Sequence, residues 1–309
     1  MDDTTFVERC IVKAGGSNSK FVKCHGVLLT ATAYVAPSLF VYAFSFFTLL
    51  PALKCPTAGG PPGSMSACTQ KDYCAKNGII DWEDSDSIVN FVTEIQPSII
   101  CDSSYHIKTS MFGTVMLAGF LIGSIFLTPL GDVHGRKKMN WILNLIQGIG
   151  IWGVTVVMAI PAITNYWALL FFTFVLGLGT AAHYNMAVIY TSEFTTWEHQ
   201  KRYTFYACVG AATVMVILGI EYYFVKSILP GLYFNSAILL FNCFYYLWLP
   251  ESPYFAYGRR QLDVFTDSID KMAAWNGVTD LDVEKLLILR AKEVDLFKQE
   301  EIKALKESF

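Results

Sequence analysis

The amino-acid sequence predicts an all-α integral membrane protein built as a six-transmembrane-helix bundle. The chain has 309 residues, of which 53% are hydrophobic and 16% are charged. A soluble domain carries about 25% charged residues, so this chain lacks the polar surface needed to cover a globule in water. Its mean hydropathy of +0.40 agrees with that conclusion. The net charge of −3 at pH 7 provides no basic footprint, and we expect no nucleic-acid partner.

Six apolar stretches have the length needed to cross the hydrocarbon core, which takes about 20 helical residues. Four of them contain no ionisable side chain, apart from tyrosine and cysteine; one contains His183 and one contains Glu221. We therefore expect the lipid bilayer to surround a bundle formed by residues 26–250. The predicted spans are 26–50, 111–130, 141–163, 166–191, 203–225 and 232–249.

The distribution of charged residues predicts which side of the membrane each loop faces. The loop between the second and third spans contains a basic run at residues 136–138. Positive charge marks the side that is not translocated. The loop over residues 51–110 carries seven acids against four lysines, so we expect it on the outer side. Six crossings then put the N-terminal segment 1–25 and the C-terminal segment 251–309 on the inner side.

The inner C-terminal segment has the pattern of amphipathic helices lying under the bundle. Apolar residues recur at helical spacing over residues 261–275 and 281–307, and charged residues occupy the other faces. We predict two inner-side helices there.

Four cysteines lie in the outer loop, namely Cys55, Cys68, Cys74 and Cys101. An even number of cysteines in an exported segment predicts disulfide bonds. Four cysteines allow three pairings, and sequence does not choose among them. Unpaired thiols in the loop are the alternative.

The loop between the second and third spans carries a motif of glycine, acid and base. It reads Leu130-Gly131-Asp132-Val133-His134-Gly135-Arg136-Lys137-Lys138. This string resembles the loop signature of the major facilitator superfamily, G-x-L-x-D-x-x-G-R-[KR]. Thr128 stands where that signature begins with glycine, which relaxes the close helix approach at that point.

Further segments narrow the resemblance to the organic cation/anion transporter branch. Thr93-Glu94-Ile95 and Ile100-Cys101-Asp102 resemble the end of the outer loop in that branch. Pro250-Glu251-Ser252-Pro253 is similar to its link after the sixth helix. Glu193-Phe194, with Arg202 downstream, resembles its helix 4–5 loop, although Arg202 comes slightly late and Tyr254 stands where arginine is usual.

The resemblance implies an inner-side gating network formed by Asp132, Arg136, Glu193 and Arg202. Charges at helix ends can exchange partners when helix bundles rock against each other. Alternatively, these residues set only topology and packing.

The resemblance covers the N-terminal six-helix half of the major facilitator fold. Members of that superfamily have two such bundles, which hold the substrate between them and rock to give alternating access. We therefore expect a half-length transporter-like protein whose substrate-facing side needs a cover. The cover would be a second six-helix bundle, from an identical or a different chain, or subunits of a larger membrane complex.

The first and fourth spans each carry a polar stripe that suits such a covered face. Polar residues recur there at steps of three or four, which keeps them on one side of a helix. Alternatively, they hold neighbouring helices together, at about 0.6 kcal/mol per contact. His183 joins this set of candidates because an ionisable group inside the membrane is often functional. Alternatively, it is a hydrogen-bonded packing residue. The candidate cavity or partner face comprises Thr30, Tyr34, Ser38, Tyr42, Thr173, Thr180, His183 and Tyr184.

No motif in the sequence points to an enzyme or a cofactor. Residues 81–92 lack the glycine and the closing glutamate of a calcium loop. Residues 15–20 lack the spacing of a phosphate loop, and no Cys/His cluster has zinc spacing. We expect neither a metal nor a catalytic site.

Three functions remain open from the sequence. The chain moves a small organic ion once a second bundle completes it, or it is a transport-inactive accessory subunit of a large membrane assembly, or it is a free regulatory half-transporter. The outer loop contains no glycosylation sequon, since Asn77 and Asn90 are followed two places on by Ile79 and Val92. That absence makes the mitochondrial inner membrane an alternative to the plasma membrane.

Overall fold

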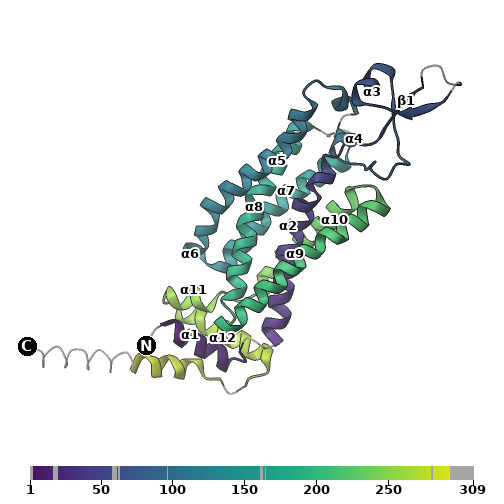
Figure 1. Ribbon diagram of the computed structural model, residues 1–309. Helices are drawn as coiled ribbons and strands as arrows, with labels where there is room; N and C mark the ends of the chain where they lie inside the picture. The colour runs from purple at the N-terminus through teal and green to yellow at the C-terminus, as the bar shows by residue number, and fades with distance from the viewer. Residues whose placement is uncertain are drawn as a thin grey trace, which may run out of the picture.

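The computed structural model describes residues 3–16, 20–57, 61, 63–95, 97–160, 163, 165–279 and 281–292. Long helices dominate this part of the chain and run roughly along one direction (Figure 1). They are α2 (Val27–Phe47), α5 (Tyr105–Ile122), α7 (Arg136–Ala159), α8 (Tyr166–Ser192), α9 (Trp197–Val225) and α10 (Leu229–Trp248).

Four helical segments among the described residues are long and apolar enough to cross a membrane. They are Tyr105–His134, Arg136–Ala159, Tyr166–Ser192 and Cys208–Val225, and Ser38–Phe47 of α2 is a shorter apolar stretch. The first segment extends α5 through a π-helical turn and a 3-10 turn into α6 (Gly131–His134). The predicted total of six spans stays a prediction.

Helix α8 lies between α5 and α7 and contacts both of them closely. A Cβ atom added to Gly177 would lie 2.4 Å from the Met116 carbonyl oxygen of α5. One added to Gly179 would lie 2.5 Å from the Gln147 backbone nitrogen of α7. Only glycine permits backbones to approach this closely. The two glycines therefore fix α8 in the interior, and α2 packs beside it against α9 and α10.

Aromatic side chains join the bundle to the loop over residues 51–110, called the outer loop for the side on which the sequence predicts it. Phe91 begins the short helix α4 (Phe91–Ile95) and is buried between Phe47 of α2 and Phe112 of α5. Its ring centroid lies 5.1 Å from each of theirs. Such aromatic contacts stabilise beyond the area they bury, so α4 anchors the outer loop on top of the helices.

The outer loop folds into a small disulfide-bonded domain, whose helix and strands were not predicted from the sequence. It holds helix α3 (Gln70–Lys76) and three short antiparallel strands in the order β2-β1-β3. The strands are β1 (Leu53–Pro56), β2 (Met65–Ala67) and β3 (Ile79–Ile80). Of the three pairings that the sequence left open, the structure has Cys55–Cys68 and Cys74–Cys101. Both predicted disulfides are therefore present.

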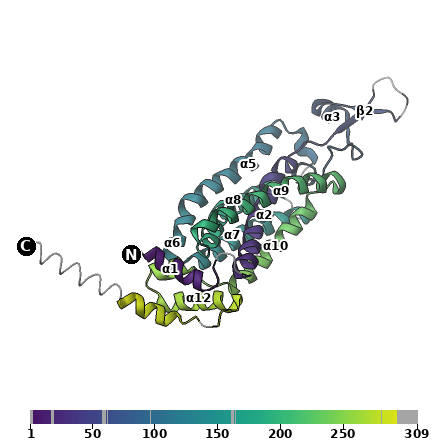
Figure 2. The same ribbon diagram turned by 60° about the horizontal axis from the view of Figure 1, so that its bottom comes forward.

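Shorter helices gather at the end of the bundle opposite α3 (Figures 1 and 2). They are α1 (Asp3–Lys13), α11 (Pro253–Gly258), α12 (Leu262–Asn276) and a helical run over residues 283–292. Their apolar faces form one cluster that includes Ile11, Phe265 and Met272. The helix predicted over 261–275 corresponds to α12. The one predicted over 281–307 is described only to residue 292, and the remainder lies outside the described residues.

Candidate functional site

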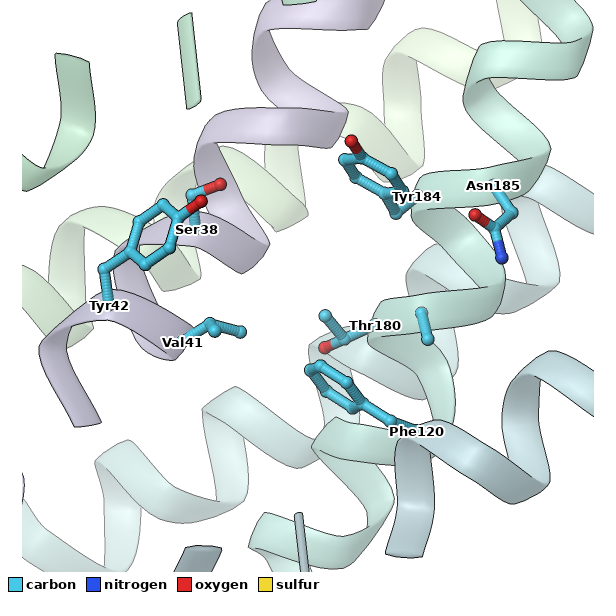
Figure 3. A pocket seen from close by; sticks show the side chains of 8 residues that line it. Ser38, Val41, Tyr42, Phe120, Thr180, Tyr184 and Asn185 are labelled. Carbon is cyan, nitrogen blue, oxygen red and sulfur yellow. The ribbon is translucent and has the colours of Figure 1, made fainter. Parts of the chain in front are cut away.

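A cavity of about 240 Å³ lies between α2, α5 and α8 (Figure 3). Ser38 and Tyr42 of α2 line one side of it, and Thr180 and Tyr184 of α8 line the other. The remaining lining residues are Val41, Phe120, Ala181 and Asn185. The lining therefore combines hydroxyl groups, an amide and aromatic rings, with no charged side chain among these residues.

The cavity unites four of the eight residues proposed from the polar stripes. Thr180 is buried and donates its hydroxyl to the Leu176 carbonyl oxygen at 2.7 Å, within its own helix. The backbone of Thr30 and Tyr34 belongs to α2, but their side chains lie outside the described part of the structure. Sequence reasoning missed Asn185, which is adjacent to Tyr184, and Phe120, which comes from a helix without a polar stripe.

His183 lies on the other side of α8, inside the bundle. It is fully buried, and its Nδ1 lies 2.7 Å from Gln147 Oε1 of α7. Its Nε2 lies 2.9 Å from the Tyr246 hydroxyl of α10. A neutral imidazole donates one hydrogen bond and accepts one, so both ring nitrogens are satisfied with Nδ1 donating to the amide oxygen. This geometry agrees with the packing role; Thr173 is also fully buried.

Arg136 is the centre of a charged cluster at the end of the bundle opposite α3, which the sequence predicts to be the inner end. Its guanidinium lies 2.6 Å from Asp132 Oδ1 and 3.1 Å from Glu193 Oε1. The side chains of Arg136 and Glu193 are only 14% and 16% exposed, whereas that of Asp132 is 66% exposed. Arg202 lies exposed on α9, and no ion pair among the described residues joins it to this cluster. The structure thus brings three of the four proposed network residues together.

The linker after α10 completes this cluster with two residues for which the sequence indicated no role. The Ser252 hydroxyl donates a hydrogen bond to Glu193 Oε2. Glu251 Oε1 accepts hydrogen bonds from the backbone nitrogens of Lys137, at 2.9 Å, and Ser252, at 3.0 Å. A carboxylate at the start of a helix is favoured by the helix dipole, so Glu251 stabilises the beginning of α7. The Pro250-Glu251-Ser252-Pro253 motif was the feature of the sequence that could have pointed to these two residues.

Gly135 makes room for this carboxylate. Its backbone has φ of +105°, which glycine adopts without steric cost. A Cβ atom there would lie 2.6 Å from Glu251 Oε2. The motif glycine therefore serves both the turn between α6 and α7 and the approach of Glu251.

Burial dominates the electrostatics of Glu193. Desolvation raises the pKa of its carboxyl, and the hydrogen bond from Ser252 and the charge of Arg136 oppose that rise. Among the described residues, no three His, Cys, Asp or Glu side chains are grouped so as to hold a metal ion. The arrangement suits a helix-end ion-pair network.

Comparisons with known proteins agree with this architecture. The family model described as "Sugar (and other) transporter" matches residues 63–306. "Solute carrier family 22 member 16" of Mus musculus is 22% identical over 198 residues, which cover 62% of this chain and 28% of that protein. "Organic cation transporter 1" of Caenorhabditis elegans is 24% identical over 207 residues, which cover 67% of this chain and 34% of that protein.

The chain therefore spans about a third of the length of the curated relatives that it matches. The family model, in contrast, covers most of the chain and includes the cavity helices α5 and α8 together with the whole inner charged cluster. The family match places the chain in a transporter family and not in an enzyme family. The chain is an integral membrane protein that belongs to the sugar (and other) transporter family, of the major facilitator type, and it is similar to organic cation transporters.

Proposed function

We propose that the chain forms a six-helix bundle that moves a small organic ion once a second bundle completes it. In this proposal α2 and α10, of 21 and 20 residues, are the first and sixth spans. At 1.5 Å per residue each is about 30 Å long, which is the thickness of the hydrocarbon core. Residues 26–250 then form the bundle, and the segments 1–25 and 251–309 lie on its inner side.

The cavity between α2 and α8 carries this proposal. Its volume of about 240 Å³ is smaller than the roughly 300–1,000 Å³ of a typical small-molecule site. A second bundle facing α2 and α8 would cover the open side of the cavity, and the space between the two bundles would add to its volume. Tyr42, Tyr184 and Phe120 offer aromatic rings to an organic cation, and organic cations are the class for which the worm relative is named.

The inner charged cluster supports a conformational cycle. The largely exposed carboxylate of Asp132 is the member of the cluster best able to exchange Arg136 for another partner. The pair of Arg136 with Glu193 is more buried and holds the ends of α7 and α8 together. In the proposed cycle, Asp132 and Arg202 alternate partners as the bundles rock.

A second candidate function is that of a transport-inactive accessory subunit. The observation that favours it is the lack of a charged residue among those that line the cavity, since a carboxylate would hold an organic cation more strongly. The polar face of α2 and α8 would then contact other subunits of a large membrane complex. The missing sequon in the outer loop is compatible with the mitochondrial inner membrane for this role as well as with the plasma membrane.

Uptake into proteoliposomes distinguishes the two candidates. We would compare the purified single chain with a covalent tandem of two copies and with any complex that the chain forms in native membranes, using tetraethylammonium as the probe. The proposal predicts no concentrative uptake by the single chain and saturable uptake by a completed form. Robust uptake by the single chain would refute completion by a second bundle. Absence of uptake by every form, with migration as a large complex on native gels, would favour the accessory role.

A further inference from the structure

A cavity of about 530 Å³ lies in the outer domain, which is the folded part of the outer loop, where α3 meets the start of α5. Both residues of the Cys74–Cys101 disulfide line it, together with Lys71, Asp102 and His106. This cavity shares no lining residue with the one between α2 and α8. Its volume is within the roughly 300–1,000 Å³ of small-molecule sites, so a small reagent can enter it and meet a disulfide.

The two disulfides of the outer domain differ in how far solvent can reach them. Cys55 is 2% exposed, and its partner Cys68 packs against the buried apolar cluster of the domain. Cys74 is half-buried, Cys101 is exposed, and neither belongs to that cluster. A thiolate must reach one sulfur of a disulfide to open it, so access governs the rate. The fold therefore shields Cys55–Cys68 and leaves Cys74–Cys101 open to attack.

Other contacts hold the chain in place on both sides of Cys101. The side-chain amide of Gln70 on α3 donates a hydrogen bond to the Ile100 carbonyl oxygen. Ile100 and Tyr105 are buried in the apolar cluster of the domain. Opening the Cys74–Cys101 bond therefore removes one covalent link between α3 and the segment that leads into α5, and leaves the core of the domain in place.

The charges around this disulfide favour an anionic thiol. The carboxylate of Asp102 is neutralised by its ion pair with Lys108. Lys71 is exposed and takes part in no ion pair among the described residues. It precedes Cys74 by three residues on α3, which puts the two on one face of the helix. A cation near a cysteine sulfur stabilises its thiolate, and it also attracts an approaching anion.

We propose that Cys74–Cys101 is a thiol-exchange site for a small anionic thiol, and that Cys101 Sγ is the sulfur attacked. The thiolate forms a bond to Cys101 Sγ, and the bond between the two Sγ atoms breaks. Its electron pair leaves with Cys74, whose thiolate takes a proton from water. A second small thiol then attacks the sulfur bound to Cys101 and releases the Cys101 thiol. Two small thiols are thereby oxidised to one disulfide, and the protein disulfide is reduced to two thiols.

The test uses the full-length chain in mild detergent, with the exposed free thiols of Cys24 and Cys208 first blocked by N-ethylmaleimide. The chain is treated with 2-mercaptoethanesulfonate, which is anionic, or with 2-mercaptoethanol, its neutral analogue. An isotopically labelled maleimide stops the reaction at set times. Tandem mass spectrometry then reads the label and any mixed disulfide at each cysteine, so that the two protein disulfides are followed separately.

We expect the Cys74–Cys101 bond to open at least about tenfold faster than the Cys55–Cys68 bond, with the mixed disulfide on Cys101 and the maleimide on Cys74. In guanidinium chloride the two bonds should react at rates within about threefold of each other, because unfolding removes the difference in access. Equal rates in the folded chain, or the same selectivity after unfolding, would overturn the proposal. A mixed disulfide on Cys74 would overturn the assignment of the attacked sulfur.

Variants of exposed lysines test the preference for an anionic thiol. At low ionic strength K71Q should lower the ratio of the sulfonate rate to the neutral-thiol rate by about twofold or more. K71R keeps the charge and should keep the wild-type ratio. K76Q is the matched control, since Lys76 belongs to the same helix, is exposed and does not line the cavity. An unchanged ratio in K71Q, or an equal fall in K76Q, would show that Lys71 does not select the thiol.

Discussion

Arg136 Nε lies 3.1 Å from Glu193 Oε1, although 57 residues separate the two in sequence. The pair joins the start of α7 to the end of α8 and is largely shielded from water. The same guanidinium also binds Asp132, whose side chain is mostly exposed. Arg136 therefore has two different partners: Glu193, which is largely buried, and Asp132, which is exposed to water.

This division predicts different consequences for the two acids. Glu193→Gln removes the buried partner of Arg136 and weakens the hydrogen bond from Ser252, so we expect a loss of about 2–3 kcal/mol in unfolding free energy. Asp132→Asn removes an exposed partner and should cost no more than about 1 kcal/mol. Unfolding of the purified variants in detergent measures both. Equal losses would contradict the division, and in a completed transporter Asp132→Asn should still slow the transport cycle.

The outer domain should lose stability in acid through Asp102. Its hydrogen bond from Lys108, and then those from Ser104, hold the pKa of the Asp102 carboxyl below its ordinary value of 3.8. Because the folded-state pKa is lowered, the stabilisation is complete above the ordinary value and is lost as the pH falls through the folded-state value. The cleavage rate of residues 51–104 by pepsin should therefore rise as the pH falls from about 4 to about 2.

The variant Asp102→Asn should already show faster cleavage at the upper end of that range and a smaller further rise as the pH falls, because the carboxyl groups of Asp72 and Asp81 in the same domain also have lowered pKa values. Glu83→Gln, a substitution of an exposed acid in the same domain, is the matched control and should keep the wild-type profile. A wild-type profile in Asp102→Asn would show that another group carries the acid sensitivity.

The disulfide pairing can be read from a digest after lysine, because the cysteines fall on convenient fragments. Cleavage at Lys54, Lys71, Lys76 and Lys108 gives fragments 55–71, 72–76 and 77–108. The pairs Cys55–Cys68 and Cys74–Cys101 predict an internal bond in the first fragment and a bond between the other two. Either alternative pairing would join fragment 55–71 to both of the others. Mass spectrometry of the non-reduced digest decides, with a reduced sample as the control.

The hydropathy windows found the long helices, but the predicted spans begin later in the chain than the helices α5 and α9 do. The second span was predicted from residue 111, whereas α5 begins at Tyr105. The window excluded Lys108 because it is charged, but the helix tolerates it because Asp102 pairs with it. The charged first turns of α9 also lie outside the predicted 203–225. A hydropathy window excludes a charged residue at a helix end, whether or not another residue pairs with it.

The candidate cavity face could be predicted only in part, for a geometric reason. Thr180 and Tyr184 are four residues apart and share one face of α8, whereas His183 is rotated toward α7 and α10. A polar stripe in the sequence does not show which neighbouring helix each of its residues will contact. The outer sheet was missed because its strands have four, three and two residues, too few for an alternating pattern to appear.

Accessibility of single cysteines tests whether the space between α2 and α8 is a working cavity. With exposed Cys24 and Cys208 replaced by serine, Asn185→Cys would be introduced at the cavity and Thr173→Cys at a buried position of the same helix. In detergent, a water-soluble thiol reagent should modify the first at least about tenfold faster than the second. Equal rates would show that the cavity does not admit water.

The same pair of variants in native membranes separates the two proposed functions. A water-filled transport cavity should keep Asn185→Cys reactive, and an organic cation that enters the cavity should slow the reaction by competing for the space. An accessory subunit should instead protect Asn185→Cys until its complex is dissociated, since a docked partner excludes water from a polar face. Protection that an organic cation does not change, and that ends when the complex dissociates, would therefore rule out transport through this face and leave the assembly role.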